Sequence, residues 1–162
     1  MSTSASNRAT FRMALMEDEP EVVELLVASS LPLDGVHDAL PWFVVAEHGG
    51  TIIGVAGIEA CGPASDHALL RSVAVSTPWQ SRGLGRALVT RAIAEAEARG
   101  VRALYLLTTT ADGYFPAFGF TITSRDAVPA DIRATAEFRE ACPASATVMV
   151  RASSNATPVV AT

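Results

Sequence analysis

The stretch that decides the fold is "TPWQSRGLGRALV", residues 77–89. It contains two glycines one residue apart, Gly83 and Gly85, and it follows the apolar run "LLRSVAV" at 69–75, which is typical of a strand. An apolar face with helical period begins inside it and consists of Leu84, Leu88, Val89, Ala92, Ile93 and Ala96. Gly100 then stands where a helix C-cap glycine is expected. The pattern therefore predicts a strand, a glycine turn and a helix in immediate succession.

The first turn of such a helix is suited to an anion. Its N–H groups have no partner within the helix, and the helix dipole adds partial positive charge. Glycines let the backbone approach a phosphate, and Arg82 and Arg86 can add charged donors. An ordinary strand-to-helix turn with solvated arginines has the same spacing and stays an alternative. A Walker A loop is not supported, because the chain has no lysine, and Leu88 stands where a dinucleotide fingerprint needs its third glycine.

Composition limits the classes of protein and partner. A chain of 162 residues that is 49% hydrophobic can bury one proper core, which favours one domain. The net charge of -5 and the lack of a basic run argue against a nucleic-acid partner. "MSTSASNRAT" has no signal-peptide pattern, and no apolar run reaches the roughly 18 residues of a membrane helix. We therefore expect a cytoplasmic domain at 9–151 between flexible tails at 1–8 and 152–162, with no membrane partner.

The rest of the chain alternates short apolar runs with turn signals, which predicts an α+β (mixed α/β) domain. We expect strands at 9–14, 42–47, 52–60, 68–76, 101–109, 120–123 and 146–151. The strand at 101–109 lacks alternation, which indicates burial on both faces. A helix opening on Glu17–Glu19 is expected to bury a stripe made of Val22, Val23, Leu26 and Val27. Shorter helical segments are expected within 31–40, 111–119 and 131–138.

The glycine turn also carries a resemblance to a known family. Gln80-Ser81-Arg82-Gly83-Leu84-Gly85 matches Q/R-x-x-G-x-G/A, and Gly119-Phe120 matches a later "GF". Over residues 9 to about 150 the chain thus resembles the GCN5-related N-acetyltransferase (GNAT) superfamily. The resemblance implies a central, mostly antiparallel mixed sheet with helices on both faces, and acetyl-CoA as co-substrate. It assigns coenzyme A binding to Val73, Ala74, Val75, Gln80, Ser81, Arg82, Gly83, Leu84, Gly85, Arg86 and Thr108.

Four further stretches suggest the kind of acceptor. "LPLDGV", "LLRSVAV", "LLTTTADGYFPAFGF" and "CPASA" look like the arsenic-resistance N-acetyltransferase branch. "LRSVAV" and "LTT...F...GF" also resemble the acetyltransferase domain of N-acetylglutamate synthase. Both likenesses imply an amino-acid-like acceptor, and the first extends this to a toxic or arsenic-containing compound.

In GNAT enzymes the amine attacks the thioester directly, so the reaction needs an oxyanion donor, a base and an acid. The resemblance assigns the oxyanion donor to the backbone N–H of Val73. The family's acid position falls on Phe115, and Tyr114, one residue earlier, is the candidate acid; a packed aromatic is the alternative. Glu59 is the candidate base, because "LLRSV" lacks the usual fourth-strand glutamate. A solvated strand-end carboxylate, with water as base, is the alternative.

Arg71 is an arginine inside an otherwise apolar strand, so it needs a partner. One interpretation pairs it with Glu59 or Asp66, and the other pairs it with the carboxylate of an amino-acid acceptor. These two interpretations are equally favoured. Arg71 and Glu59 are thus the candidate substrate-binding residues.

Two functions are consistent with the sequence. The favoured one is an acetyl-CoA-dependent N-acetyltransferase that acts on a small amino-acid-like amine. The alternative is a non-catalytic sensor of acyl-CoA or a metabolite, since the family's tyrosine and fourth-strand glutamate are missing. No metal is expected, because Cys61 and Cys142 lie far apart without paired histidines, and metalloid binding by their thiolates is a minor alternative. A homodimer is one expected assembly.

Overall fold

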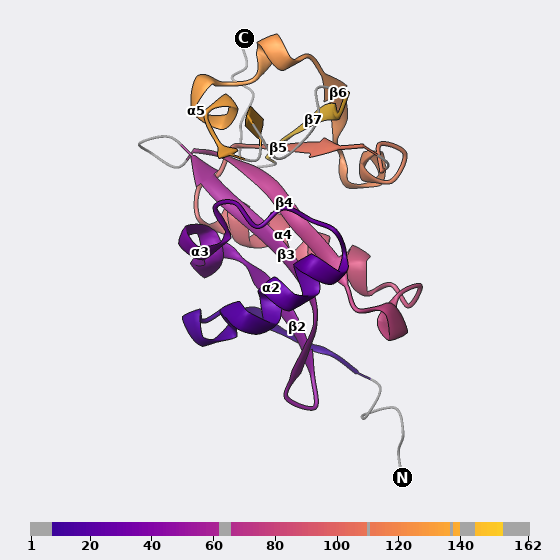
Figure 1. Ribbon diagram of the computed structural model, residues 1–162. Helices are drawn as coiled ribbons and strands as arrows, with labels where there is room; N and C mark the ends of the chain where they lie inside the picture. Colours follow the sequence, from indigo (N-terminus) through magenta and orange to yellow (C-terminus); the bar gives the residue numbers. More distant parts are fainter. Residues whose placement is uncertain (1–7, 62–65, 110, 137, 140–144, 154–162) are drawn as a thin grey trace. The chain divides into compact units, whose positions relative to one another are not determined.

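A computed structural model gives the arrangement of the chain (Figure 1). It describes residues 8–61, 66–109, 111–136, 138–139 and 145–153. Apart from Arg8, Ala152 and Ser153, the two expected tails lie outside these residues. The strands form a 7-stranded sheet in the order β1-β2-β3-β4-β5-β7-β6.

The chain divides into two compact units. Unit 1 consists of Met1–Ile58 and Ser72–Ile93, and unit 2 consists of Glu59–Arg71 and Ala94–Thr162. Strands β3 and β4 and helix α4 each contribute residues to both units.

Unit 1 begins with an antiparallel meander. Strand β1 (Thr10–Met13) pairs with β2 (Val44–His48), and β2 pairs with β3 (Thr51–Cys61). The β2–β3 connection uses Gly49 at φ 59° and Gly50 at φ 82°, as a tight hairpin turn requires. The hairpin expected from the sequence is thus confirmed, except that Trp42 precedes β2 in a 3₁₀ helix (Leu40–Trp42).

Helix α2 (Glu19–Ala28) corrects the apolar stripe expected from the sequence. Val22 and Leu26 are fully buried, but Val27 is 59% exposed, and Leu25 packs against the core in its place. Residues three and four apart share a helix face, so Leu25 and Leu26 follow Val22 toward the strands while Val27 turns away. The acidic start of the helix, after a 3₁₀ turn at Met16–Asp18, was predicted correctly.

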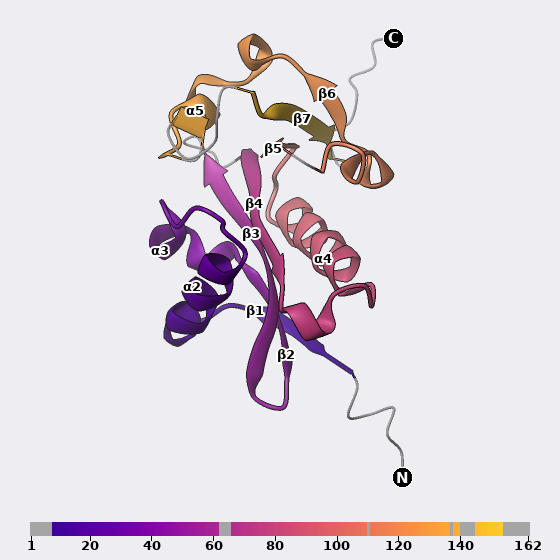
Figure 2. The same ribbon diagram turned by 45° about the vertical axis from the view of Figure 1, so that its right-hand side comes forward.

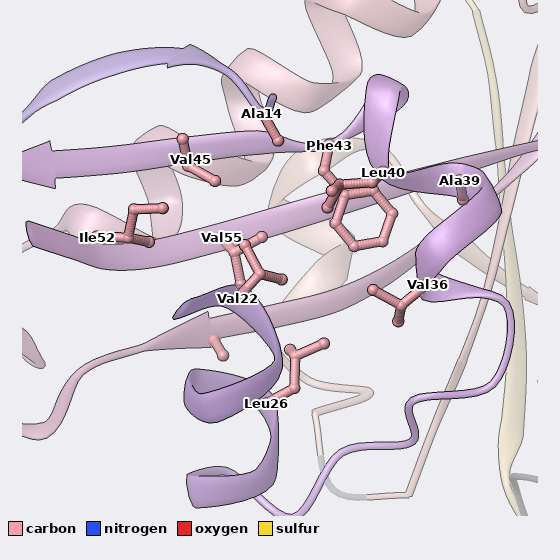
Figure 3. Close-up of a cluster of buried hydrophobic side chains, with 11 residues drawn as sticks. Ala14, Val22, Leu26, Val36, Ala39, Leu40, Phe43, Val45, Ile52 and Val55 are labelled. Carbon is pink, nitrogen blue, oxygen red and sulfur yellow. The ribbon is translucent and has the colours of Figure 1, made fainter. Parts of the chain in front are cut away.

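The core of unit 1 lies between α2 and the strands. Figure 3 shows Val22 of α2 close to Val55 of β3, and Phe43 packed beside Leu40. The short helix α3 (Val36–Ala39), expected as one helical turn, adds Val36 to the same cluster. Phe43 is completely buried, and its ring fills the space beside Gly57, where an added Cβ would come within 2.5 Å of it.

Helix α4 (Leu84–Ala98) confirms the helix predicted between the glycine turn and Gly100. Within unit 1, Figure 2 shows α2 and the first part of α4 on opposite faces of β2 and β3. The helix packs closely on β3, because a Cβ added to Gly54 would lie 2.7 Å from Leu88 Cδ1 and 3.4 Å from Leu84 Cδ2. The close approach fixes the start of α4, and so the glycine turn, against the sheet.

Unit 2 contains the remaining strands. The first part of β4 (His67–Val75) pairs in parallel with β5 (Ala103–Thr108), from His67↔Ala103 to Leu69↔Tyr105. Strand β7 (Thr147–Ala152) lies antiparallel between β5 and β6 (Thr121–Thr123). The mixed, mostly antiparallel sheet predicted from the sequence is thus confirmed.

The expected burial of β5 on both faces is wrong. Leu104 and Leu106 are buried, whereas Ala103, Tyr105 and Leu107 on the other face are only half-buried. That second face meets a small core made of Cys61, Leu69, Val128, Ile132, Phe138 and Val148. Helix α5 (Ala130–Arg133) supplies Ile132 to this core, in agreement with the helical turn predicted there.

Candidate functional site

The turn before α4 has the backbone form that its sequence predicts. A 3₁₀ helix (Thr77–Trp79) follows β4, and Ser81 at φ 66° and Gly83 at φ 82° then reverse the chain into α4. The side-chain amide of Gln80 donates a hydrogen bond to the carbonyl of Val75 (2.9 Å) and so ties the turn to the end of the strand. Gln80 therefore has a structural role in the turn that the sequence alone did not reveal.

The same turn is open to solvent. Ser81, Arg82 and Gly83 are exposed, and a Cβ added to Gly83 would meet nothing within 4 Å. The first hydrogen bond of α4 runs from the N–H of Ala87 to the carbonyl of Gly83 (3.1 Å). The N–H groups of the residues between them come before the helical ladder and suit an anion such as a phosphate.

The backbone conformation of strand β4 changes at Ser72, immediately before the residues Val73–Val75 that are expected to contact coenzyme A. Ser72 is buried and has φ 58°, a left-handed conformation that is uncommon outside glycine. The parallel register with β5 reaches only Leu69 and Tyr105. Val73 and Val75 beyond this point are half-buried, and Ala74 between them belongs to the core of unit 1. Val73 and Val75 thus keep part of their surface accessible.

Arg71 and Glu59 form an ion pair in unit 2. Arg71 Nη1 lies 2.7 Å from Glu59 Oε1, with the Arg71 side chain 0% exposed and the Glu59 side chain 21% exposed. The pairing with Glu59 is one of the two partners expected from the sequence. Asp66, the other expected partner, lies 3.1 Å from His67. The carboxylate of Glu59 is therefore partly accessible, and it is held by the fully buried guanidinium of Arg71.

His67 makes a second contact, with α5. Its Nε2 lies 2.6 Å from Asp131 Oδ1, and this hydrogen bond holds the pKa of Asp131 below its ordinary value. The contact joins β4 to α5 within unit 2. It stabilises the fold of this unit.

Two other candidates take part in local packing. Tyr114 is 37% exposed, and its ring packs against Phe115 and Phe118 with centroids 5.2 and 5.3 Å apart. The hydroxyl oxygen of Thr108 accepts a hydrogen bond from the N–H of Ala111 (2.9 Å), which stabilises the turn after β5. These contacts explain both side chains as parts of the local structure. By themselves they do not support Tyr114 as the acid or Thr108 as a coenzyme A contact.

The cysteines do not form a metal-binding group in the described part of the chain. Cys61 is buried, and burial, with nearby Glu59 and Asp131, raises the pKa of its thiol to about 12. A thiol in this environment stays protonated at neutral pH and is a poor ligand. Cys142 lies outside the described residues. Among the described residues, no group of three or more His, Cys, Asp or Glu that could hold a metal is found. No helix of the described residues is both long and apolar enough to cross a membrane.

Sequence reasoning missed an aromatic and basic cluster beside the glycine turn. The guanidinium of Arg82 lies 5.1 Å from the centre of the Trp79 ring, and the Trp79 ring lies 4.8 Å from that of His48. The tryptophan three residues before the turn arginine was the available signal. His48 could not be predicted, because it reaches Trp79 only through the fold of the hairpin.

Comparisons with known proteins agree with this geometry. A model of the acetyltransferase (GNAT) family matches residues 8–120. The N-acetylglutamate synthase of Neisseria gonorrhoeae, solved with coenzyme A and N-acetyl-glutamate, is 24% identical with a TM-score of 0.76. The match covers 90% of this chain but only 35% of the synthase, so this chain spans about a third of that enzyme.

Two smaller proteins are similar over nearly their whole length. Rv2747 of Mycobacterium tuberculosis, solved with coenzyme A, is 23% identical with a TM-score of 0.73, and the match covers 88% of this chain and 98% of that one. The diaminobutyrate acetyltransferase of Paenibacillus lautus, solved with L-2,4-diaminobutyric acid and coenzyme A, is 18% identical with a TM-score of 0.66. That match covers 90% of this chain and 95% of the other. At these identities the likeness establishes a shared fold.

Proposed function

This chain belongs to the acetyltransferase (GNAT) family, and from that premise we propose that it transfers an acetyl group from acetyl-CoA to the amine of a small, amino-acid-like acceptor. One observation carries the proposal. The exposed turn at Ser81–Gly83, with positive φ at both ends and open space around Gly83, has the form that a pyrophosphate needs. Charged donors from Arg82 and Arg86 add to the attraction.

The role of each residue follows from the charge that develops, or the proton that moves, at each step of the reaction. The amine attacks the thioester carbonyl, so negative charge grows on the carbonyl oxygen, and we assign its stabilisation to the N–H of Val73. Glu59 removes the proton from the acceptor's ammonium, and Tyr114 returns a proton to the departing thiolate of coenzyme A. The assignment of Val73 rests on the family resemblance, whereas Glu59 and Tyr114 are assigned as the available carboxylate and the available hydroxyl, and both side chains are partly exposed.

The ion pair of unit 2 indicates how the acceptor is held. The Arg71 side chain has no exposed surface and lies 2.7 Å from Glu59, so we do not expect a carboxylate of the acceptor to reach it in this arrangement. The geometry instead favours Glu59 as the group that meets the acceptor's ammonium, with Arg71 holding the Glu59 carboxylate in place. Arg71 is then a positioning residue, and the amino-acid-like character of the acceptor is supported by the likeness to N-acetylglutamate synthase and the diaminobutyrate enzyme.

The acceptor can be identified by thiol release from acetyl-CoA across paired amines. Each pair differs only in its α-carboxylate, for example L-2,4-diaminobutyrate with 1,3-diaminopropane and alanine with ethylamine. Two further arms carry a phosphinate or an arsenical side chain, because the resemblance to the arsenic-resistance branch extends the proposal to toxic amino acids. We expect faster release with the carboxylate-bearing member of at least one pair.

The outcomes separate the two functions. Binding of acetyl-CoA without thiol release for any amine would contradict catalysis and favour the sensor. Equal rates for both members of every pair would contradict the amino-acid-like acceptor while leaving the acetyltransferase intact.

A further inference from the structure

Strand β6 (Thr121–Thr123) forms one edge of the sheet in unit 2. The strand order ends in β5-β7-β6, and no described strand lies beyond β6 (Figure 2). An edge strand directs backbone N–H and C=O groups outward, so it can pair with a strand of another chain unless a charge, a proline or a bulge prevents it. Residues 119–124, "GFTITS", contain neither a charge nor a proline. The pairing of β6 with β7 also runs in regular register, from Thr121↔Val150 to Thr123↔Val148.

Ile122 is the last member of an apolar row that crosses three strands of unit 2. Leu106 of β5, Met149 of β7 and Ile122 of β6 lie in register, so their side chains share one face of the sheet. Leu106 is 2% exposed and Met149 is 1% exposed, whereas Ile122 is 68% exposed. No other large hydrophobic residue in the described part of the chain is as exposed. The row is therefore covered at its inner members and open at the sheet edge.

The sequence of this edge is complementary to itself. When two identical strands pair antiparallel about a two-fold axis, one residue faces its own copy and the residues on either side exchange places. With Ile122 at the axis, Ile122 meets Ile122 of the second copy on one face of the sheet. On the other face, Thr121 meets Thr123 of the second copy. Pairs of β-branched side chains and pairs of threonines both stabilise neighbouring strands.

Other positions of the axis fit less well. An axis at Thr123 would place Ile122 opposite Ser124 and Thr121 opposite Arg125. The most exposed apolar side chain would then face a polar one. With the axis at Ile122, the next pair outward is Phe120 with Ser124, and no charged residue lies within 119–124. The pattern of the strand therefore favours the axis at Ile122.

We propose that two copies of this chain associate by antiparallel pairing of their β6 strands about a two-fold axis at Ile122. The inference is independent of the proposed acetyl transfer, because β6 contains none of the residues assigned to that reaction. A strand of three residues gives a small interface, at the low end of specific interfaces, where the total buried area is below about 1,200 Å². The dimer should therefore be weak, and its population should rise with protein concentration.

Sedimentation over a wide range of concentration, up to several hundred micromolar, tests the dimer. We expect the wild-type chain to pass from monomer to dimer over this range. Ile122→Lys should raise the dissociation constant of the dimer by roughly tenfold or more, because it places two like charges opposite each other at the axis. Val27→Lys is the matched control, since Val27 is a 59% exposed residue of α2 in unit 1, and it should dimerise like the wild-type chain.

Cysteine crosslinking tests the register of the two strands. Residues directly opposite each other have Cβ atoms about 4.5 to 5.5 Å apart, which a disulfide or a short thiol crosslinker can bridge. Under mild oxidation, Ile122→Cys should join to its own copy. Thr121→Cys and Thr123→Cys should each join slowly alone and rapidly when the two variants are mixed. The wild-type chain under the same oxidation controls for Cys61 and Cys142.

Two kinds of result would overturn the inference. A wild-type chain that stays monomeric at every concentration would exclude the dimer. A dimer that Ile122→Lys leaves intact, or in which Ile122→Cys fails to crosslink, would place the interface on another surface. None of these measurements uses acetyl-CoA, so their failure would leave the proposed function unaffected.

Discussion

In unit 1 the turn before α4 offers backbone N–H groups at exposed residues, whereas in unit 2 Arg71 keeps its whole side chain out of solvent and directs it at Glu59. The first arrangement depends on backbone conformation, above all on the positive φ of Gly83. The second depends on which acidic group the fold brings to a buried guanidinium. Binding by the backbone therefore leaves a short motif in the sequence, while chemistry by side chains depends on contacts between separate elements.

Removing the carboxylate of Glu59 should have the largest effect on turnover. If Glu59 is the base, Glu59→Gln should lower kcat by roughly 10² to 10⁴ while acetyl-CoA binding stays unchanged. Glu97→Gln is the matched control, because Glu97 also pairs with an arginine of unit 2, Arg151. Steady-state kinetics would reject the assignment if both variants lost activity equally.

Tyr114→Phe tests the acid in the same unit. The substitution keeps the packing against Phe115 and Phe118, so a loss of about 10² in kcat would come from the hydroxyl. Tyr105→Phe, which changes a half-buried tyrosine of β5, serves as the control. A loss smaller than about threefold would make Tyr114 a packed aromatic and leave protonation of the thiolate to water.

Arg71→Lys distinguishes a positioning residue from a carboxylate-binding one. A lysine ammonium cannot reproduce the guanidinium geometry at Glu59, so we expect a loss of roughly tenfold in kcat/KM for amines with and without a carboxylate alike. Arg151→Lys, at another guanidinium–carboxylate pair of this unit, should leave these rates unchanged. A loss confined to carboxylate-bearing amines would instead place the acceptor's carboxylate on Arg71.

Gly57→Ala should have the smallest functional effect and a clear effect on stability. Its Cβ would lie 2.5 Å from the buried ring of Phe43, so we expect a loss of about 1 to 3 kcal/mol in the free energy of unfolding. Gly113→Ala is the control, since its Cβ would meet nothing within 4 Å. Urea denaturation should separate the two variants, and equal stability would show that Phe43 can move aside.

Much of unit 1 could be predicted from the sequence because its signals are local. The glycine turn, the hairpin at Gly49 and Gly50, and the start of α2 follow from backbone preferences of the residues that form them. The burial errors have a different origin. Val27 and the half-buried face of β5 depend on which neighbour covers each face, and the apolar character of a residue does not contain that information.

The candidate site, like the fold, could be predicted only where its signals are local in the sequence. The coenzyme A motif directly identifies the residues of the turn. The sequence did not show whether Glu59 or Asp66 is the partner of Arg71. The pairing depends on contacts between strands in the fold, where Arg71 meets Glu59 and His67 contacts Asp66 and Asp131. In the same way, the contact of Trp79 with His48 joins residues that are distant in the sequence.

The most direct measurement is calorimetric titration of acetyl-CoA into Gly83→Val and Gly100→Val. Both glycines have positive φ, 82° and 95°, and an added Cβ would meet nothing within 4 Å at either position, so the two variants carry a similar backbone strain. If the turn holds the pyrophosphate, Gly83→Val should lose affinity by roughly tenfold or more, because the distorted turn no longer aims its N–H groups at the phosphates, while Gly100→Val should bind like the wild-type protein. Unchanged affinity in a folded Gly83→Val protein, or an equal loss in both variants, would contradict coenzyme A binding at this turn.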